Sequence, residues 1–240
     1  MKKKLSKIIA YAAVPCLIAA LLISFIGLLS GDRAWIKREY EKLDINDYTG
    51  MSTEDMCAAY LRMTDYMQGK TDELQLEVTA FGERTDMFNE REISHMADVR
   101  RLWFGVDKVK HILYVFTVFA AALAVYAFGR EAPAVLSRCW LIGLGVTAAF
   151  AVALAVWAAL DFESFWVVFH IVFLDLESST FDPVTSRMIR ICVEQLFSDL
   201  ILRIALFTGG TCAGIGLIAG LTLALSKKRG KAARNGAGQH

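Results

Sequence analysis

Two histidines stand in surroundings that suit acid–base chemistry. His95 lies in the stretch Arg91–Val99 (REISHMADV), and His170 lies inside the apolar run Phe165–Leu174 (FWVVFHIVFL). Imidazole exchanges protons near neutral pH, so a partly buried histidine can act as a general acid or base. The residues alone leave two interpretations open: a catalytic pair, or two buried histidines whose hydrogen bonds are satisfied within the fold.

The spacing around His95 predicts its neighbours. If the segment is helical, the face of His95 also carries Phe88 and Glu92, because residues three or four apart are neighbours on a helix. We therefore expect His95 to point toward an apolar surface, with a carboxylate one turn away. Glu92 and Asp98 are the candidates for orienting its ring.

Other kinds of chemistry find little support. The sequence contains neither the G-x-S-x-G pattern of a hydrolase nucleophile nor the H-E-x-x-H pattern of a zinc site. We expect no metal and no cofactor. His170 and Asp175 have the H-x-x-x-x-D spacing of glycerolipid acyltransferases, but two residue types at one spacing arise easily by chance.

The composition indicates an integral membrane protein. Of the 240 residues, 55% are hydrophobic and 21% charged, and the formal net charge of +1 gives no reason to expect a nucleic-acid partner. About 20 apolar residues are enough to cross a bilayer as a helix. Four runs meet this length, and we predict a span in each: Ile8–Leu29, His111–Gly129, Cys139–Leu160 and Leu200–Leu225.

The basic residues predict an orientation. Lysines and arginines gather before the first span, between the second and third, and in the tail 226–240, which places both ends in the cytoplasm. The segments 31–110 and 161–199 are then extracellular. Arg203, near the outer end of the fourth span, is expected to snorkel to the interface, and as an intramembrane charge it is also a candidate for orienting a polar headgroup.

These elements predict a membrane all-α fold with a small α+β cap. Within the cap we expect a helix over 53–67, a strand over 74–80 and a helix over 86–104. The run 165–174 is too short to span and suits an interfacial or re-entrant segment. The expected parts are 1–30, tail and first span; 31–110, cap; 111–160, two spans; 161–199, interfacial loop with an amphipathic lead over 184–199; 200–225, fourth span; and 226–240, a disordered basic cytoplasmic tail.

The histidine segments resemble the bacterial lipoprotein intramolecular transacylases, the Lit family. The resemblance rests on Arg91–Val99, on Phe169-His170, and on Phe181-Asp182-Pro183 followed by Glu194 and Phe197. The layout is also similar, with four spans, a large loop after the first and a shorter loop after the third. The sequence departs from the family pattern where Leu176, Glu177 and Ser179 replace an Asn-Asp and a Trp, and where Val193 and Leu196 replace a Pro and a Phe.

The resemblance implies an enzyme of the bacterial plasma membrane whose active site faces outward. Its substrate would be a diacylated lipoprotein, and the sn-2 acyl chain would move to the α-amino group of the lipidated cysteine, giving a lyso-form product. It implies general acid–base roles for His95 and His170, with neither histidine assigned as the acid or the base. Supporting or orienting roles fall to Arg91, Glu92, Asp98 and Asp175. Candidate pocket residues are Phe88, Trp103, Trp166, Phe169, Phe173 and Arg203.

Alternatives remain open at this point. For any single aromatic residue named above, an interfacial belt or core packing is the simpler interpretation. A non-enzymatic membrane sensor that binds a ligand or protein through the cap is the alternative function, and intermolecular glycerolipid acyltransfer is a third. Membrane lipids are expected partners, and the sequence leaves the oligomeric state open. It also leaves open whether Cys57 and Cys192 pair.

Overall fold

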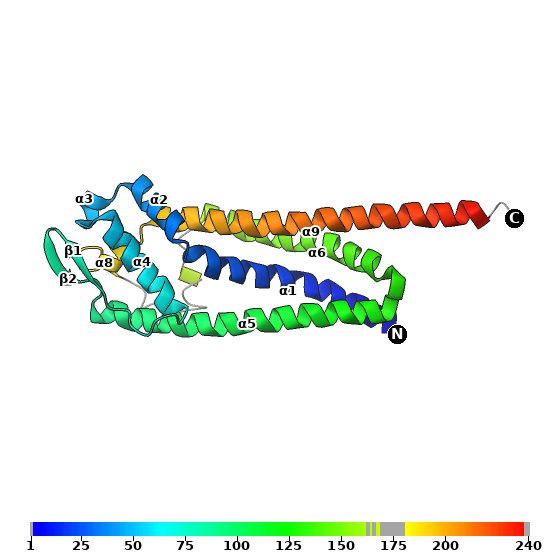
Figure 1. Ribbon diagram of the computed structural model, residues 1–240, viewed down its shortest axis with the longest axis horizontal. Helices are drawn as coiled ribbons and strands as arrows, with labels where there is room; N and C mark the ends of the chain where they lie inside the picture. Colours follow the sequence, from blue (N-terminus) through cyan, green and yellow to red (C-terminus); the bar gives the residue numbers. More distant parts are fainter. Residues whose placement is uncertain (1, 162–163, 165–166, 169–180, 238–240) are drawn as a thin grey trace. The chain divides into compact units, whose positions relative to one another are not determined.

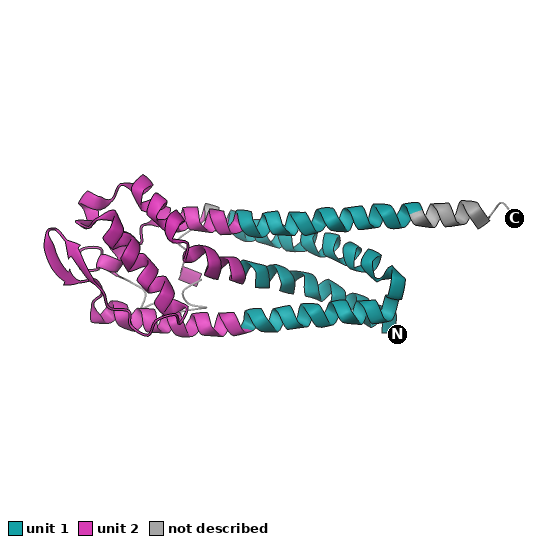
Figure 2. Ribbon diagram, viewed as in Figure 1, with its two compact units in different colours: residues 1–22, 109–156, 206–240 teal, residues 23–108, 157–205 magenta. Residues whose placement is uncertain are grey.

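The computed structural model describes residues 2–161, 164, 167–168 and 181–237. The chain forms two compact units (Figure 2): unit 1 comprises residues 1–22, 109–156 and 206–240, and unit 2 comprises residues 23–108 and 157–205. Long helices contribute residues to both units. These helices are α1 (Lys2–Ser30), α5 (Glu90–Phe128), α6 (Ala132–Leu160) and α9 (Glu194–Ala237) (Figure 1).

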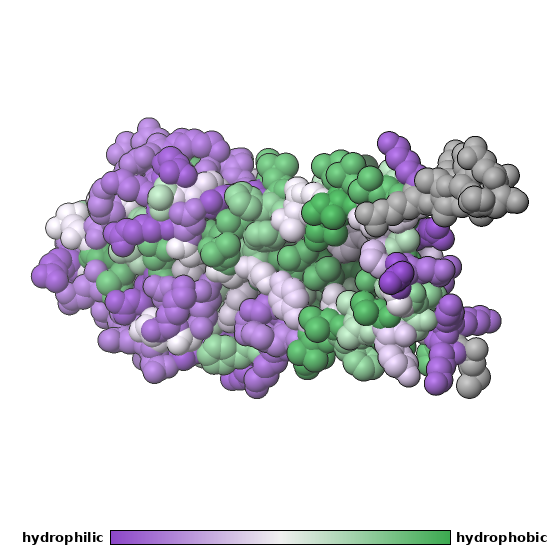
Figure 3. Space-filling model, turned by 45° about the vertical axis from the view of Figure 1, so that its right-hand side comes forward, coloured by the Kyte–Doolittle hydropathy of each residue, from purple (hydrophilic) through white to green (hydrophobic). Residues whose placement is uncertain are grey.

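Unit 1 is built from segments of these four helices. Hydrophobic side chains cover the middle of the visible face, hydrophilic side chains gather near the chain termini, and hydrophilic side chains dominate the visible face of unit 2 (Figure 3). The short 3-10 helix η1 (Gly129–Glu131) separates α5 from α6. Gly129 has a φ of +53°, a left-handed conformation that glycine adopts easily. Pro133 follows in the first turn of α6, where its missing N–H group costs little.

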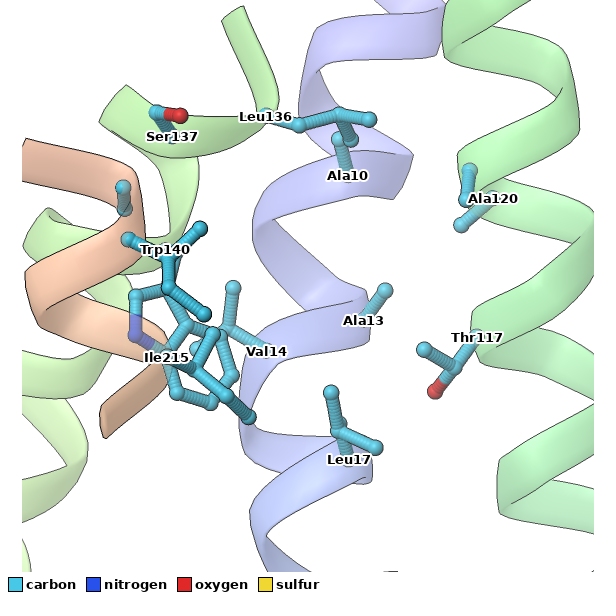
Figure 4. A pocket seen from close by; sticks show the side chains of 13 residues that line it. Ala10, Ala13, Val14, Leu17, Thr117, Ala120, Leu136, Ser137, Trp140 and Ile215 are labelled. Carbon is cyan, nitrogen blue, oxygen red and sulfur yellow. The ribbon is translucent and has the colours of Figure 1, made fainter. Parts of the chain in front are cut away.

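Close helix packing forms the core of unit 1. Val14, Trp140 and Cys212 are buried together from α1, α6 and α9. Gly143 lies so close to Val14 that an added Cβ would stand 2.7 Å from the valine Cβ. Next to this contact is an apolar pocket of about 260 Å³, lined mainly by small and branched side chains of all four helices (Figure 4).

Three segments of the described chain are long and apolar enough to cross a membrane. They are Lys2–Ser30, Glu90–Trp157 and Glu194–Lys228. The second contains α5 and nearly all of α6, whereas the sequence predicts one span in each of these two helices. Three features stay predictions: the four crossings, the cytoplasmic placement of both ends, and the division of the chain at 30, 110, 160, 199 and 225.

Unit 2 holds the small α+β part of the fold. Its helices are α2 (Arg33–Leu43), α3 (Asn46–Thr49), α4 (Thr53–Met67) and α8 (Arg187–Ile191), and its strands are β1 (Glu77–Ala80) and β2 (Glu83–Asp86). The helix predicted over 53–67 is confirmed as α4. Its first turn is capped by Ser52, whose hydroxyl accepts a hydrogen bond from the Asp55 backbone N–H at 3.0 Å.

A tight hairpin joins the two strands. The strands are antiparallel, with Val78 opposite Thr85 and Ala80 opposite Glu83. Phe81 and Gly82 form the two-residue connection, and both have positive φ, +52° and +83°, as a type I′ turn requires. The strand predicted over 74–80 is therefore confirmed only in its second half, where pairing with β2 begins.

The core of unit 2 combines two stretches that are far apart in the sequence, one that ends in the first turns of the long helix α5 and one that follows α6. Buried side chains come from α2, α4, the hairpin, the residues before and within the first turns of α5, α8 and the start of α9, and include Tyr40, Met56, Phe88, Ile191 and Leu196. The Tyr40 hydroxyl donates to the Ile191 carbonyl at 3.1 Å, which ties α2 to α8. Burial raises the pKa of Tyr40 well above its usual value, so the phenol stays a neutral donor.

Three predicted element boundaries are wrong. The helix predicted over 86–104 begins at Glu90 and continues to Phe128, because no cap or proline interrupts it where the sequence turns apolar. The sequence predicts a disordered tail after 225, yet α9 continues to Ala237, since its lysine, arginine and alanine residues favour helix. The lead over 184–199 is also broken, because Cys192 and Val193 separate α8 from α9.

Candidate functional site

A capping box starts the helix that carries His95. The Asn89 backbone N–H donates to Glu92 Oε2 at 2.7 Å, and the Glu92 backbone N–H donates to Asn89 Oδ1 at 2.9 Å. This reciprocal pair satisfies two N–H groups that the first turn of α5 would leave unpaired. The first turn is thereby fixed one turn before His95.

The same Glu92 side chain reaches α8. Glu92 is 1% exposed, and its Oε1 accepts hydrogen bonds from the Ser186 hydroxyl and from the Met188 backbone N–H at 3.1 Å. Ser186 in turn caps α8, because its Oγ accepts from the Ile189 backbone N–H at 3.2 Å. One buried carboxyl group thus receives three donors and joins two segments that are 94 positions apart at Ser186.

An aromatic contact brings the two segments together at His95. The His95 ring meets Phe181 edge to face, with ring centroids 5.2 Å apart and an interplanar angle of 73°. The Arg91 guanidinium lies 5.3 Å from the centroid of the same phenylalanine ring. Arg91 and His95 are four residues apart on α5, so one helix face holds Phe181 with two side chains.

A turn built on Asp182 presents Phe181 to α5. Asp182 Oδ1 accepts a hydrogen bond from the Val184 backbone N–H at 2.8 Å, and its carbonyl accepts from the Ser186 backbone N–H at 2.9 Å. Aspartate followed by proline favours such a turn, because the side chain bonds its own backbone two residues on and proline fixes φ. The Phe-Asp-Pro sequence therefore places Phe181 and Ser186 against α5 at opposite ends of a short turn.

The other described candidates lie in different surroundings. Phe88 is 2% exposed in the core of unit 2. Asp98 pairs with Arg101, 3.1 Å away on the same helix. Trp103 packs on α1, where an added Cβ on Gly27 would stand 3.0 Å from the indole ring.

Arg203 is held by protein groups near the start of α9. Its Nη2 lies 2.6 Å from Asp32 Oδ2, and its guanidinium lies 5.0 Å from the Trp35 ring centroid. Asp32 also caps α2, since its Oδ1 accepts from the Trp35 backbone N–H at 3.2 Å. The hydrogen bond from Arg203 lowers the pKa of Asp32. Arg203 therefore fixes the N-terminus of α2 to α9.

Cys57 and Cys192 are free thiols in this structure. Burial raises the pKa of the Cys57 thiol. Burial, with a further contribution from the Glu92 carboxylate, raises the pKa of Cys192 to about 12. Both thiols are therefore protonated at neutral pH and are poor nucleophiles.

Comparison with known proteins decides the family. A family model described as lipoprotein intramolecular transacylase Lit matches residues 11–197, a stretch that includes both segments joined by Glu92. The chain belongs to this family. It is accordingly an acyltransferase, and its long apolar helices are those of a membrane protein. No curated protein matches the sequence.

Solved structures of a Lit protein share the fold. Lit from Bacillus cereus, a membrane-integral lipoprotein intramolecular transacylase, superposes with a TM-score of 0.71 at 18% identity, covering 95% of this chain and 97% of that one. Two variants of that protein, with one histidine replaced by arginine or by alanine, match with the same TM-score and identity and are covered over 94% and 95% of their length. At this identity the likeness establishes the fold.

Several predicted site residues lie outside the described part of the chain. These are His170, Asp175, Trp166, Phe169 and Phe173. The pairing of His95 with His170 that the family resemblance implies therefore stays a prediction. Within the ranges the structure does describe, no group of three or more His, Cys, Asp or Glu side chains is arranged to hold a metal.

Sequence reasoning missed two contacts in this Lit family member. The sequence places Phe181 in a family motif but gives no sign of its contact with His95, because nothing local to either residue signals a partner so far along the chain. Ser186 was not singled out at all. Its position before the apolar Met188 and Ile189 fits a helix N-cap, and Asn89-x-x-Glu92 fits a capping box, so both caps were readable from the sequence.

Proposed function

We propose that this Lit family member moves the sn-2 acyl chain of a diacylglyceryl-modified lipoprotein to the α-amino group of its lipidated cysteine. The amine nitrogen attacks the ester carbonyl carbon, the C–N bond forms and the bond from that carbon to the glyceryl oxygen breaks. The proton lost by the amine goes to a base, and an acid protonates the departing oxygen. The product is an N-acylated lyso-form lipoprotein, an isomer of the substrate.

The convergence of the two family motifs at His95 is the observation that supports this proposal. His95 is half-buried, held against Phe181 by an edge-to-face contact, and stands on a turn fixed by the Asn89–Glu92 box. A histidine in this setting can take the proton of an α-amino group, whose pKa is about 8. His170 is the second proton carrier of the proposal, with the base and acid roles left unassigned. Arg91, Asp98 and Asp175 are proposed to support the two imidazoles.

The chemistry needs no covalent intermediate. Donor ester and acceptor amine belong to one molecule, so holding them together supplies a large part of the rate enhancement. The high pKa of Cys57 and Cys192 agrees with a mechanism in which no thiolate attacks. The aromatic residues that the family resemblance assigns to the pocket, Trp166, Phe169 and Phe173, are proposed to join Phe181 in excluding water, so that the amine rather than water attacks the ester. Trp103 packs on α1 instead.

The proposed location is the outer face of a bacterial plasma membrane. The basic residues at both ends of the chain favour four crossings with both ends in the cytoplasm, which puts unit 2 outside, where mature lipoproteins carry their lipid. Labelling of single cysteines in intact cells tests the orientation. A cysteine placed at the exposed Glu83 should react with an impermeant maleimide, and one placed at Arg130 should react only after lysis.

One assay separates the candidate functions. Purified protein is mixed with a diacylated lipopeptide and no other acyl donor, and because the product has the mass of the substrate, conversion is followed by fragment ions of the N-acyl cysteine. We expect conversion by the wild type and a loss of at least about 100-fold in His95→Ala and His170→Ala, the usual scale for a lost acid or base. His111→Ala is the matched control.

The outcomes distinguish the alternatives. Transfer at the wild-type rate by both histidine variants would defeat the site assignment. A need for an added glycerolipid donor would favour intermolecular transfer and a role for Asp175 in it. Binding of the lipopeptide without conversion would favour the sensor function.

A further inference from the structure

Unit 2 contains a second cavity that the proposed chemistry does not use. It has a volume of about 230 Å³ and lies between the β1–β2 hairpin and the segment that follows Phe181. In Figure 1 the hairpin and α8 lie side by side. Thr49, Thr85 and Thr185 belong to the residues that line it. The Thr49 hydroxyl is buried and already bonded to the Ile45 carbonyl and the Met51 N–H, so the hydroxyls that face a ligand are those of Thr85 and Thr185. Such groups can both donate and accept hydrogen bonds, as a bound peptide backbone requires.

Two arginines give this cavity a positive character. Arg187 Nη1 donates to the Asp86 carbonyl at 3.1 Å, and Arg190 donates from Nε to the Pro183 carbonyl at 2.6 Å and from Nη2 to the Val184 carbonyl at 2.7 Å. These bonds go to neutral oxygens, so they fix both guanidiniums without cancelling their charges. Glu83 is the carboxylate that lines the same cavity. Two cations and one anion favour a ligand that carries a carboxylate.

The rim of the cavity is apolar and partly strained. Phe81 is 66% exposed and Val184 is 76% exposed, although both side chains are apolar. Phe81 has a φ of +52°, a conformation that costs a residue other than glycine about 1 kcal/mol or more. Its ring rests over Gly50, which has no side chain to displace it. Phe81 and Val184 therefore give the polar cavity an exposed apolar rim, on which a ligand can bury apolar surface.

The cavity lies within short reach of His95. Val184 and Thr185 belong to the turn that presents Phe181 to the histidine ring. The Cα atoms of Phe181 and Val184 are three residues apart, which is at most about 11 Å. An extended peptide advances about 3.3 Å per residue. A chain whose first residue reacts near His95 can therefore reach the cavity with its third to fifth residue.

We propose that this cavity binds the polypeptide that follows the lipidated cysteine of the substrate, with a preference for an acidic residue at about the third to fifth position. The inference rests on the proposed function, since it extends the substrate from the reacting cysteine into its peptide. The hydroxyls of Thr85 and Thr185 bind the peptide backbone, Arg187 and Arg190 bind the carboxylate, and Phe81 and Val184 cover the peptide.

Competition between matched lipopeptides tests the inference. Three diacylated lipopeptides carry two Glu, two Gln or two Lys residues at positions three to five and are otherwise identical. We expect the wild type to convert the acidic peptide with a kcat/KM about tenfold above the basic one. Glu83→Lys should raise this ratio several-fold. Arg190→Gln should lower it toward one, and Arg190→Lys should retain part of it.

Glu77→Lys is the matched control. It changes the charge of the same hairpin by the same amount, but Glu77 lies on β1 and pairs with Arg84 outside the cavity lining. An equal effect of Glu77→Lys and Glu83→Lys, or a wild-type ratio of one, would overturn the inference. So would a ratio that follows only the anionic lipid content of the vesicles, which would assign the arginines to lipid headgroups. Failure of the wild type to convert any of the three peptides would instead reject the proposed function.

Discussion

Glu92 connects the two segments that carry the family motifs. Its carboxyl group accepts from Asn89, Ser186 and Met188, and hardly any of its surface is exposed. A buried acceptor with three donors cannot be removed without leaving those donors unpaired, which is costlier than the bonds themselves. Glu92 is thus a positioning residue for the segment that contacts His95.

Truncation of Glu92 should destabilise the protein more than neutralisation. We expect Glu92→Ala to lower the free energy of unfolding by about 2–5 kcal/mol, because it leaves the buried donors of Ser186 and Met188 and the Asn89 N–H without their acceptor, and Glu92→Gln to lower it by less. Thermal unfolding in detergent measures both. Glu90→Ala, an exposed carboxylate two residues away, is the control. Equal melting temperatures for Glu92→Ala and Glu90→Ala would show that the network contributes no stability.

At the scale of elements, the sequence predicts those helices and strands that depend only on neighbouring residues. The helix over 53–67 was predictable because Met56, Tyr60 and Met63 recur at helical spacing after the capping Ser52. The length of α5 was not, because the change from amphipathic to apolar sequence suggests an element boundary that the helix does not have. A helix ends where its hydrogen bonds end, and the switch in polarity near His111 breaks none of them. The contact of His95 with Phe181 could not be predicted, since it depends on how distant elements pack.

Helix packing in unit 1 depends on the absence of a side chain at Gly143. We expect Gly143→Val to lower the unfolding free energy by about 1–3 kcal/mol, because the new side chain would overlap Val14. The double variant with Val14→Ala should recover a large part of the loss. Gly145→Val is the control, since nothing lies within 4 Å of its added Cβ. Failure of Val14→Ala to restore stability would locate the strain elsewhere.

At the scale of the whole molecule, a few polar ties join distant parts of the sequence. Arg203 and Asp32 are 171 positions apart, yet they form an ion pair that also holds the first turn of α2. The sequence suggested a snorkelling or headgroup-binding arginine, because a single chain gives no indication of which acid a cation will meet. The coarse plan of apolar helices with a small α+β part was readable, since it depends on composition and period alone.

Acidification should weaken the Arg203–Asp32 tie. The pKa of Asp32 is lower in the folded protein than its ordinary value of about 3.9. Its contribution to stability is therefore complete above that value and is lost as the pH falls through the lowered folded pKa. We expect Asp32→Asn to be less stable than the wild type at pH 7 and the difference to shrink below about pH 4. A difference that stays constant from pH 7 to pH 3 would contradict this.

The Glu92 carboxyl group, which accepts from the backbone N–H groups of both Asn89 and Met188, has a consequence for how the site folds. We expect the first turns of α5 and α8 to order together, since burial of Glu92 requires the donors of both. The two amides should therefore open in one concerted event. Native-state deuterium exchange would find Asn89 and Met188 protected to the same degree, as members of a single cooperative unit in which His95 acquires its surroundings all at once.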